Sequence, residues 1–415
     1  MRAIPAARFA RVEAVKIGAG SDSITEARMV SVETFLRRIP QEMARAFMKR
    51  CGVSLPENLD WSGKVRQTTL RIKACIEAAG QGPQSRVMRD YERIASMADE
   101  AGQIALLSVC KHCSVLERLE NAYSRAYWLF ENEFEAFRRA EEARYTDEHR
   151  RGRNWTGVLT KSGLSVRTDL SSLQAFKAAV LQELKSENIH VDVFERRRKS
   201  FDGKVYSIIQ VTIYREGPAQ DYPEFINGNL DWRSRRPVYE AAVTYEARGG
   251  VVEVVAENRD SRENLLQCFV RDLLGESDQQ PLPLREFNLD PLLRPCTFPT
   301  DPRDGIEWVR VTMLRLQPFD SPDQRITLEC ASKEPGEIWS MANVQFGKKN
   351  PLMIGYAVTQ AKLVIRFHPE ADACRGKTLP LTVKMPHGCD LKGRTSKEMM
   401  IGEKYLKRWN LLCHA

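Results

Sequence analysis

Five side chains that could do chemistry lie within eight residues near the C-terminal end of the chain. The segment reads PHGCDLKGRTSKE and contains His387, Cys389, Asp390, Lys392 and Arg394. A thiol activated by an imidazole is one arrangement used for nucleophilic catalysis. Cations at the start of a helix are instead typical of an anion contact, because the helix N-terminus exposes backbone N–H groups. Two interpretations therefore arise, catalysis or anion binding.

The local pattern favours anion binding. Pro386 and the neighbouring glycines predict a turn, and the order of His387 and Cys389 gives no sign that the imidazole reaches the thiol. We therefore interpret Lys392 and Arg394 as binding residues that precede a helix. His387 and Cys389 are kept as catalytic candidates for a thiol-dependent enzyme.

A second pair of residues raises the alternative of a metal-dependent nuclease. Gln360 and Lys362 in TQAKLVIRF lie two residues apart, so they share one side of a predicted strand. Such nucleases place an acidic residue or Gln two positions before a Lys, to bind the ion and activate water. A clear metal-binding Asp on a preceding strand is missing, because Asp320 and Asp323 fall in a predicted turn.

The motif C-K-H-C, from Cys110 to Cys113, has the spacing of a redox site or of half a zinc site. No second C-x-x-C or H-x-x-x-H lies nearby to complete a tetrahedral site. Both cysteines fall in a helical pattern on the same stripe as Leu116, which favours buried structural cysteines. We expect no metal and no cofactor.

Familiar nucleotide and hydrolase motifs are missing from the sequence. It contains no G-x-x-x-x-G-K-[ST] and no G-x-G-x-x-G between a strand and a helix. It also lacks G-x-S-x-G, H-E-x-x-H and the protein-kinase signatures. Enzyme classes that depend on these motifs therefore have no support.

Two basic segments are candidates for contacts with a polyanion. FERRRKSFDGK contains Arg196, Arg197, Arg198 and Lys199, and DWRSRRPVY contains Trp232, Arg233, Arg235 and Arg236. We expect both at strand ends or turns, where an aromatic ring with guanidinium groups suits stacking and phosphate contact on single strands. An acidic protein partner, or a charged hairpin tip without a ligand, would explain the same residues.

The first third of the chain has helical periodicity, and we expect a helical bundle over residues 23–155. Its last helix, predicted as one helix over 107–150, has an aromatic stripe. The stripe includes Leu116, Tyr123, Phe130 and Phe137 at spacings that place them on one side. This stripe belongs either to the bundle core or to an interface with a partner protein or a second copy of the chain.

The rest of the chain has strand alternation interrupted by helices. Residues 165–276 read as an α-β-β-β-β-α unit, with Gly249 and Gly250 at a hairpin turn. Residues 277–304 are rich in proline, which predicts a linker without regular structure. Residues 305–415 read as β-β-α-β-β-α, and Thr395 with Glu398 forms a capping box for the final helix.

We therefore predict an α+β protein in which a helical bundle precedes two mainly antiparallel sheet domains with packed helices. Residues 1–22 are expected to form a short N-terminal arm.

Composition indicates an ordinary intracellular globular chain. Its 415 residues suggest two or three domains, and ten cysteines without a dense framework favour a reduced, cytoplasmic protein. No apolar run is long enough for a membrane helix, so no membrane contact is expected. The net charge is +8, although residues 162–295 carry 18 basic and 21 acidic side chains, so the positive charge lies toward the two ends. This balance permits contact with nucleic acid.

These observations predict a non-catalytic binding or adaptor subunit that contacts nucleic acid or an acidic protein through basic loops. A metal-dependent nuclease or a thiol-dependent enzyme is the alternative. The excess of Arg over Lys is expected of a GC-rich bacterial genome. We hypothesise that the subunit belongs to a bacterial multiprotein system such as phage defence.

Overall fold

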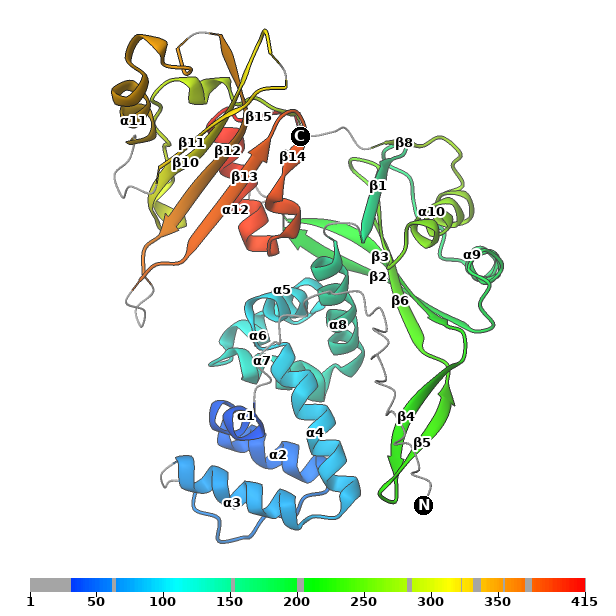
Figure 1. The fold of residues 1–415 in the computed structure, drawn as a ribbon. Helices are drawn as coiled ribbons and strands as arrows, with labels where there is room; N and C mark the ends of the chain where they lie inside the picture. The colour runs from blue at the N-terminus through cyan, green and yellow to red at the C-terminus, as the bar shows by residue number, and fades with distance from the viewer. Residues whose placement is uncertain are drawn as a thin grey trace, which may run out of the picture. The chain divides into compact units, whose positions relative to one another are not determined.

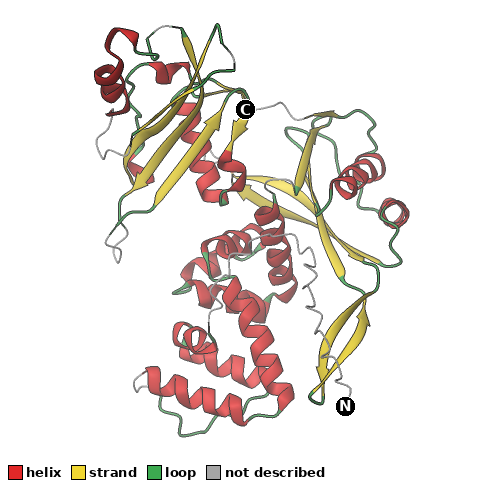
Figure 2. Ribbon diagram, viewed as in Figure 1, coloured by secondary structure: helices red, strands yellow, loops and turns green. Residues whose placement is uncertain are grey.

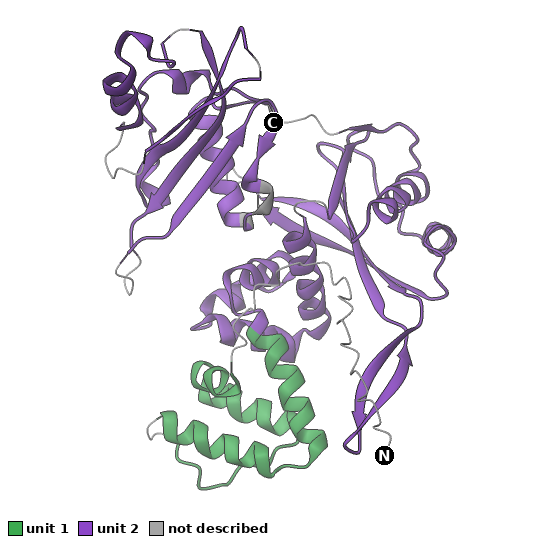
Figure 3. Cartoon of the chain, in the orientation of Figure 1, with its two compact units in different colours: residues 1–95 green, residues 96–415 purple. Residues whose placement is uncertain are grey.

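The computed structural model describes residues 31–61, 65–150, 154–199, 205–281, 286–321, 323–330, 337–353, 355–369 and 375–414. The predicted arm, residues 1–22, lies outside these ranges. The chain divides into two compact units, residues 1–95 and 96–415 (Figure 3). The boundary between the units falls inside the predicted helical bundle, and the domain limits inferred from the sequence stay predictions.

The first unit is built from helices. They are α1 (Val32–Arg38), α2 (Gln41–Cys51), α3 (Val65–Ala78) and α4 (Gln81–Ser96). The aromatic rings of Phe35 and Phe47 meet edge to face with centroids 5.3 Å apart, and Tyr91 lies 6.0 Å from Phe35. All three side chains are buried, so contact between aromatic rings joins α1, α2 and α4.

The second unit begins with further helices. They are α5 (Glu100–Val109), α6 (Cys113–Arg118), α7 (Ala122–Asn132) and α8 (Phe134–His149). The prediction of one long helix over 107–150 is wrong, because the chain leaves helical geometry at Cys110, Leu119 and Glu133. Asn121 then caps α7 by accepting a hydrogen bond from the Ser124 N–H.

The aromatic stripe in these helices belongs to the protein core. Leu116, Phe130 and Phe137 are fully buried, and Phe130 meets Phe137 edge to face at 5.1 Å. The stripe is therefore covered by the protein's own residues and does not form an exposed surface.

A six-stranded antiparallel sheet follows, in the order β2-β3-β6-β7-β1-β8 (Figure 1). Its strands are β1 (Trp155–Leu159), β2 (Ile189–Lys199), β3 (Val205–Glu216), β6 (Val238–Glu246), β7 (Val251–Val255) and β8 (Gln280–Pro281). Gly250 takes a φ of +68° in the turn between β6 and β7, as the predicted hairpin requires. A Cβ atom at Gly250 would lie 2.3 Å from the Thr160 carbonyl oxygen, so only glycine fits there.

One side of this sheet carries a hydrophobic core. The helices α9 (Leu170–Glu183) and α10 (Arg259–Cys268) cover it, and α10 continues as a π-helical segment, Phe269–Leu274. Phe176 of α9 and Phe269 pack against alternate strand residues such as Val211 and Val243. Gly275 ends the helical segment with a φ of +67°, a left-handed conformation that glycine adopts without strain.

A two-stranded hairpin extends from the ends of β3 and β6. Its strands β4 (Gln220–Ile226) and β5 (Asn229–Arg235) form a sheet of their own. Asn227 and Gly228 both have positive φ, which is the geometry of a type I′ turn. The predicted basic segment DWRSRRP therefore runs along a strand of this hairpin.

A second antiparallel sheet lies in the C-terminal part, in the order β11-β10-β12-β13-β14. Its strands are β10 (Ile306–Pro318), β11 (Ile326–Glu329), β12 (Tyr356–Phe367), β13 (Thr378–Lys384) and β14 (Gly388–Cys389). The helices α11 (Glu337–Phe346) and α12 (Ser396–Arg408) pack on one side through buried residues such as Trp339, Tyr405 and Trp409. The capping box of Thr395 and Glu398 begins α12 as predicted.

The proline-rich stretch is more ordered than predicted. It contains a short 3₁₀ helix, Asp290–Leu293, and a strand, β9 (Glu286–Phe287), that pairs with β15 (Leu412–His414). Leu289 and Leu292 are fully buried in the core of the C-terminal sheet. The prolines therefore prevent long elements without preventing the segment from packing.

The predicted α+β class is confirmed (Figure 2). Helices precede two mainly antiparallel sheets, and further helices pack on each sheet. In the residues that the structure describes, no helix has the length and apolar character needed to cross a bilayer.

Candidate functional site

The second side of the six-stranded sheet is polar, yet a helix covers it. Gln210, Thr212 and Thr244 alternate with the core residues of β3 and β6, and all three are buried. The side chains of α8 lie over them, since the Gln210 amide donates to the Thr146 hydroxyl at 3.0 Å. The polar residues that alternate with apolar ones along β3 and β6 therefore do not face solvent. They form a polar interior between the sheet and α8.

The centre of this interface is a set of five charged residues, which we call the guanidinium cluster. It consists of Arg150, Arg196, Arg198, Asp147 and Glu253. The Arg196 side chain is 1% exposed and donates two hydrogen bonds to the Asp147 carboxylate, at 2.7 and 2.9 Å. Its Nε donates to the Gln210 side chain at 2.7 Å. Arg198 bridges Asp147 at 3.0 Å and Glu253 at 2.8 Å.

Ion pairing dominates the electrostatics of the cluster. Burial alone would raise the pKa of the Asp147 carboxyl, but the Arg196 and Arg198 guanidiniums outweigh burial and hold that pKa well below the usual range of aspartate. Burial is likewise outweighed at Glu253, where Arg150 and Arg198 lower the carboxyl pKa to about 2. Both carboxyls are therefore ionised at neutral pH and tie α8 to strands β2 and β7.

A pair of carboxyl groups lies elsewhere on the same interface. Glu142 of α8 accepts a hydrogen bond from the Tyr214 hydroxyl at 3.1 Å, and its other oxygen is buried without a partner among the described residues. Glu240 of β6 also has a buried oxygen without a described partner. Burial, with a smaller contribution from the charge of Glu142, raises the pKa of Glu240 to about 8.

The C-K-H-C motif lies between two helices. Cys110 follows the end of α5 and is buried, and burial raises the pKa of its thiol to about 11. Cys113 begins α6, and its sulfur lies 2.8 Å from Nη2 of Arg197, which also donates to the Cys110 carbonyl. Arg197 is thus engaged with α5 and α6.

The predicted basic segment at 196–199 forms the last four residues of β2. Arg196 and Arg198 point into the guanidinium cluster, and Arg197 contacts the cysteine motif on the other side of the strand. The structure describes the backbone of Lys199 but not its side chain. The three described guanidiniums are therefore held by contacts inside the protein.

The other basic segment is on the surface of the β4–β5 hairpin. The Trp232 side chain is 64% exposed. Arg233 and Arg235 lie 3.7 and 2.8 Å from the Glu224 carboxylate, and Arg236 lies 3.0 Å from Glu187. These ion pairs are exposed, so they contribute little to the stability of the fold, and the arginines can exchange their carboxylates for other anions.

The side of the C-terminal sheet opposite α11 and α12, which we call the outer face, carries several cationic side chains and a tryptophan. Its charged residues are Arg310 and Arg315 of β10, Lys362 and Arg366 of β12, Lys384 of β13, and the acids Glu307 and Glu329. The Arg310 guanidinium lies 3.7 Å from the Trp308 ring centroid, and the Arg366 guanidinium lies 5.8 Å from it.

Gln360 and Lys362 both belong to this outer face. The intervening residue Ala361 and the next residue Leu363 are buried in the core, so the two polar side chains point to the opposite side of β12. Across the strands, Gln360 is opposite Arg315 and Lys384, and Lys362 is opposite Thr382. Within the described ranges, no group of three or more His, Cys, Asp or Glu residues is arranged to hold a metal ion.

The residues of the PHGCDLKGRTSKE segment lie in different local environments. His387 is exposed in a turn, whereas Cys389 pairs with Val383 and packs against the core. Arg394 donates to Asp390 at 3.1 Å and to the Pro380 carbonyl at 2.9 Å. Lys392 lies in the 3₁₀ helix Asp390–Gly393, and its side chain is not described.

Sequence reasoning missed the acidic partners Asp147 and Glu253 and the cations Arg310 and Arg315. The signal for the outer face was present, because Trp308, Arg310 and Thr312 alternate with apolar residues in WVRVTML. Asp147 gave no such signal, since it is one of many charges at the end of a helix. Its role depends on a partner 49 residues away in the chain.

Comparison with known proteins gives no family for this chain. No protein-family model matches the sequence, and no curated protein matches it.

We expect Asp147→Ala to reduce the free energy of unfolding by about 3 to 5 kcal/mol, because it leaves the Arg196 guanidinium buried without a carboxylate. Urea denaturation measures this loss. The control is Glu263→Ala, which removes the carboxylate of the exposed Arg259–Glu263 pair and should cost less than about 1 kcal/mol. Equal losses in the two variants would contradict a structural role for the cluster.

We also expect the stability of the protein to decrease between about pH 4.5, the ordinary pKa of a glutamate, and about pH 8, the pKa of Glu240 in the folded protein. The raised pKa means that the folded state holds a proton that the unfolded state releases, so folding becomes less favourable across this window. Glu240→Gln keeps a neutral side chain and should stabilise the protein at pH 8 by up to about 4 to 5 kcal/mol, the free energy of a pKa that differs by about 3.5 between the folded and unfolded states.

Thermal or urea unfolding of both proteins across this pH range measures the effect. The difference between Glu240→Gln and the original protein should disappear toward pH 4.5. Glu257→Gln, at an exposed glutamate, is the control and should leave the pH profile unchanged. A Glu240→Gln profile parallel to that of the original protein would show that Glu240 is ionised when folded.

Proposed function

We propose that this protein is a non-catalytic binding subunit whose outer face binds single-stranded nucleic acid. The observation that carries the proposal is the proximity of two guanidiniums, those of Arg310 and Arg366, to the Trp308 ring on a sheet face with a cationic excess. The described residues of this face include five cations and two carboxylates, so its net charge is +3. Phosphate groups would neutralise that charge.

Free charge distinguishes the outer face from the guanidinium cluster. Arg366 pairs with Glu307 at 3.1 Å, but Arg315, Lys362 and Lys384 form no ion pair with any residue in the described ranges. Cations without a carboxylate partner can bind phosphate without first breaking an internal pair. The three lie on neighbouring strands β10, β12 and β13, so they form one continuous surface.

Shape also supports a single strand as the ligand. An antiparallel sheet with one covered and one open side offers a flat platform on which unpaired bases can stack. Trp308 and the planar guanidiniums of Arg310 and Arg366 supply stacking surfaces, and base stacking tolerates any sequence because every base has a flat face. The proposed specificity is therefore for single strands and not for a particular base order.

We expect Arg315→Ala and Lys362→Ala each to weaken the binding of a single-stranded oligonucleotide and to reduce its salt dependence. Loss of one phosphate contact should lower the slope of log K against log salt by about 0.7. Fluorescence anisotropy over a range of salt concentrations measures both quantities. Trp308→Leu should weaken binding by about 1 to 3 kcal/mol for each base that stacks there. Trp308→Phe should retain part of this stacking energy, because it keeps an aromatic ring.

Arg259→Ala is the control, because this arginine is exposed on α10 and pairs with Glu263. Unchanged affinity in Arg315→Ala and Lys362→Ala, or no binding by the original protein at low salt, would reject the outer face as the site. Cleavage of the oligonucleotide when Mg²⁺ is added, lost in Lys362→Ala, would support the nuclease alternative instead.

The β4–β5 hairpin favours a second candidate function, self-association. Pro223 is opposite Trp232 and Phe225 is opposite Leu230, so these four residues share one side of the ribbon. Phe225 is 74% exposed and Leu230 is 57% exposed. Among the described residues, β4 and β5 pair only with each other, so both strand edges are open. Exposed apolar sides and open edges are typical of association surfaces.

The occupant that we propose for this surface is the same hairpin of a second copy of the chain. We expect the original protein to show a concentration-dependent dimer in sedimentation velocity, and Phe225→Asp to remain monomeric because a carboxylate cannot be buried in an apolar contact. Tyr222→Asp makes a matched change on the opposite side of the hairpin and should preserve the dimer. A monomer at all concentrations would exclude this function.

The wider setting of this subunit, a bacterial multiprotein system such as phage defence in the cytoplasm, stays a prediction from the sequence.

A further inference from the structure

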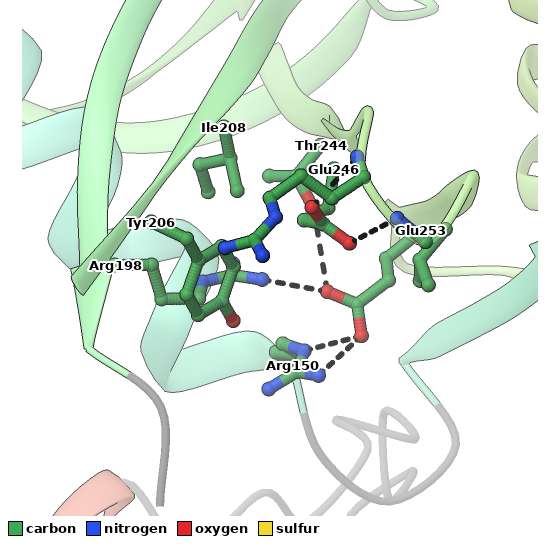
Figure 4. A pocket seen from close by; sticks show the side chains of 10 residues that line it. Arg150, Arg198, Tyr206, Ile208, Thr244, Glu246 and Glu253 are labelled. Carbon is green, nitrogen blue, oxygen red and sulfur yellow. Dashed lines mark hydrogen bonds and ion pairs between the residues drawn. The ribbon is translucent and has the colours of Figure 1, made fainter. Parts of the chain in front are cut away.

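A pocket opens beside the guanidinium cluster, at the turn that joins β6 and β7. It has a volume of about 550 Å³, which is within the range of small-molecule sites. Its walls carry the cations Arg150, Arg198 and Arg248, the acids Glu246 and Glu253, and the phenol ring of Tyr206. Figure 4 shows Arg150 and Arg198 approaching the Glu253 carboxylate from two sides.

The acceptor groups of the cluster are nearly saturated. One Glu253 oxygen accepts from Arg150, and the other accepts from Arg198 at 2.8 Å and from the Thr244 hydroxyl at 3.4 Å. A guanidinium has five N–H donors, and Arg150 directs only part of them to Glu253. Because the Arg150 side chain is 29% exposed, its remaining donors can reach a ligand from solution.

Charge in the cluster is also unbalanced. Three guanidiniums of the cluster face two carboxylates, so the described part of it has a net charge of +1. At the mouth of the pocket, both oxygens of Glu246 accept backbone N–H groups, from Arg248 and Gly249, at 2.8 Å. The exposed Arg248 side chain forms no ion pair with a described residue. An anion in the pocket would therefore meet a cationic excess.

We propose that this pocket binds a small phosphate ester of nucleotide size, with the phosphate held by Arg150 and Arg248. Guanidinium groups match phosphate oxygens with two parallel hydrogen bonds, which favours phosphate over a monodentate anion. The Tyr206 ring and the Ile208 and Val251 side chains supply an apolar wall for the organic part of the ligand. This site is independent of the outer face and of the hairpin.

The test is calorimetric titration of the full chain with inorganic phosphate and with adenosine and guanosine monophosphate, at constant ionic strength. We expect saturable binding of the nucleotides, and weaker binding of phosphate alone. Arg248→Ala should reduce nucleotide affinity about tenfold, the effect of losing a charge-assisted contact. Tyr206→Leu should reduce nucleotide affinity while leaving the affinity for inorganic phosphate unchanged.

Two controls make the outcome specific. Arg259→Ala removes an exposed arginine outside the pocket and should bind like the original protein. Lys362→Ala alters the outer face and should also keep its nucleotide affinity, so failure of this pocket and failure of the proposed nucleic-acid site are distinguishable. The proposal is overturned if no probe binds saturably at millimolar concentration, or if Arg248→Ala binds the nucleotides as tightly as the original protein.

Discussion

The burial of the Arg196 guanidinium is the constraint on which the second unit depends. A guanidinium cannot lose its proton in a protein, so a fully covered arginine without a carboxylate partner costs about 3 to 5 kcal/mol of stability. Asp147 supplies that carboxylate from α8, 49 residues earlier in the chain. The position of α8 against β2 is therefore set by charge, whereas the other side of α8 packs into the helical core through Phe137 and Ala140. One helix thus joins a hydrophobic interior to a polar one.

The order of charges along α8 also sets its register on the sheet. Arg139 of α8 pairs with Asp192 of β2, and eight residues later Asp147 pairs with Arg196, four residues further along β2. Eight residues of helix rise about 12 Å, and four residues of strand rise about 13 Å. The two elements therefore match in length between the pairs. Because the sign of the charge on the helix reverses from one pair to the next, a shift of the helix along the strand would bring like charges together.

Much of the fold could be predicted because strands and helices reveal their covered sides locally. The strands β2, β3, β6 and β7 followed from alternation, and the capping box at Thr395 identified the start of α12. The breaks in the predicted 107–150 helix were missed because no glycine or proline marks them, and only Asn121 signals a new start. ERRRK was interpreted as a basic surface because local sequence cannot show that Asp147 and Glu253 meet its alternate arginines. Long-range pairing of charges is thus what the sequence alone concealed.

The cations of the two sheets differ in whether a carboxylate lies beside them. On the six-stranded sheet, Arg196 and Arg198 form ion pairs with Asp147 and Glu253. These pairs hold α8 on the sheet. On the outer face, Arg315 and Lys362 lie opposite Gln360 and Met313, which are neutral, and neither cation forms an ion pair with a residue in the described ranges. A count of basic residues cannot distinguish the two sheets, since both contain strands that are rich in cations. What distinguishes the two sets is whether the fold itself places a carboxylate beside the cation.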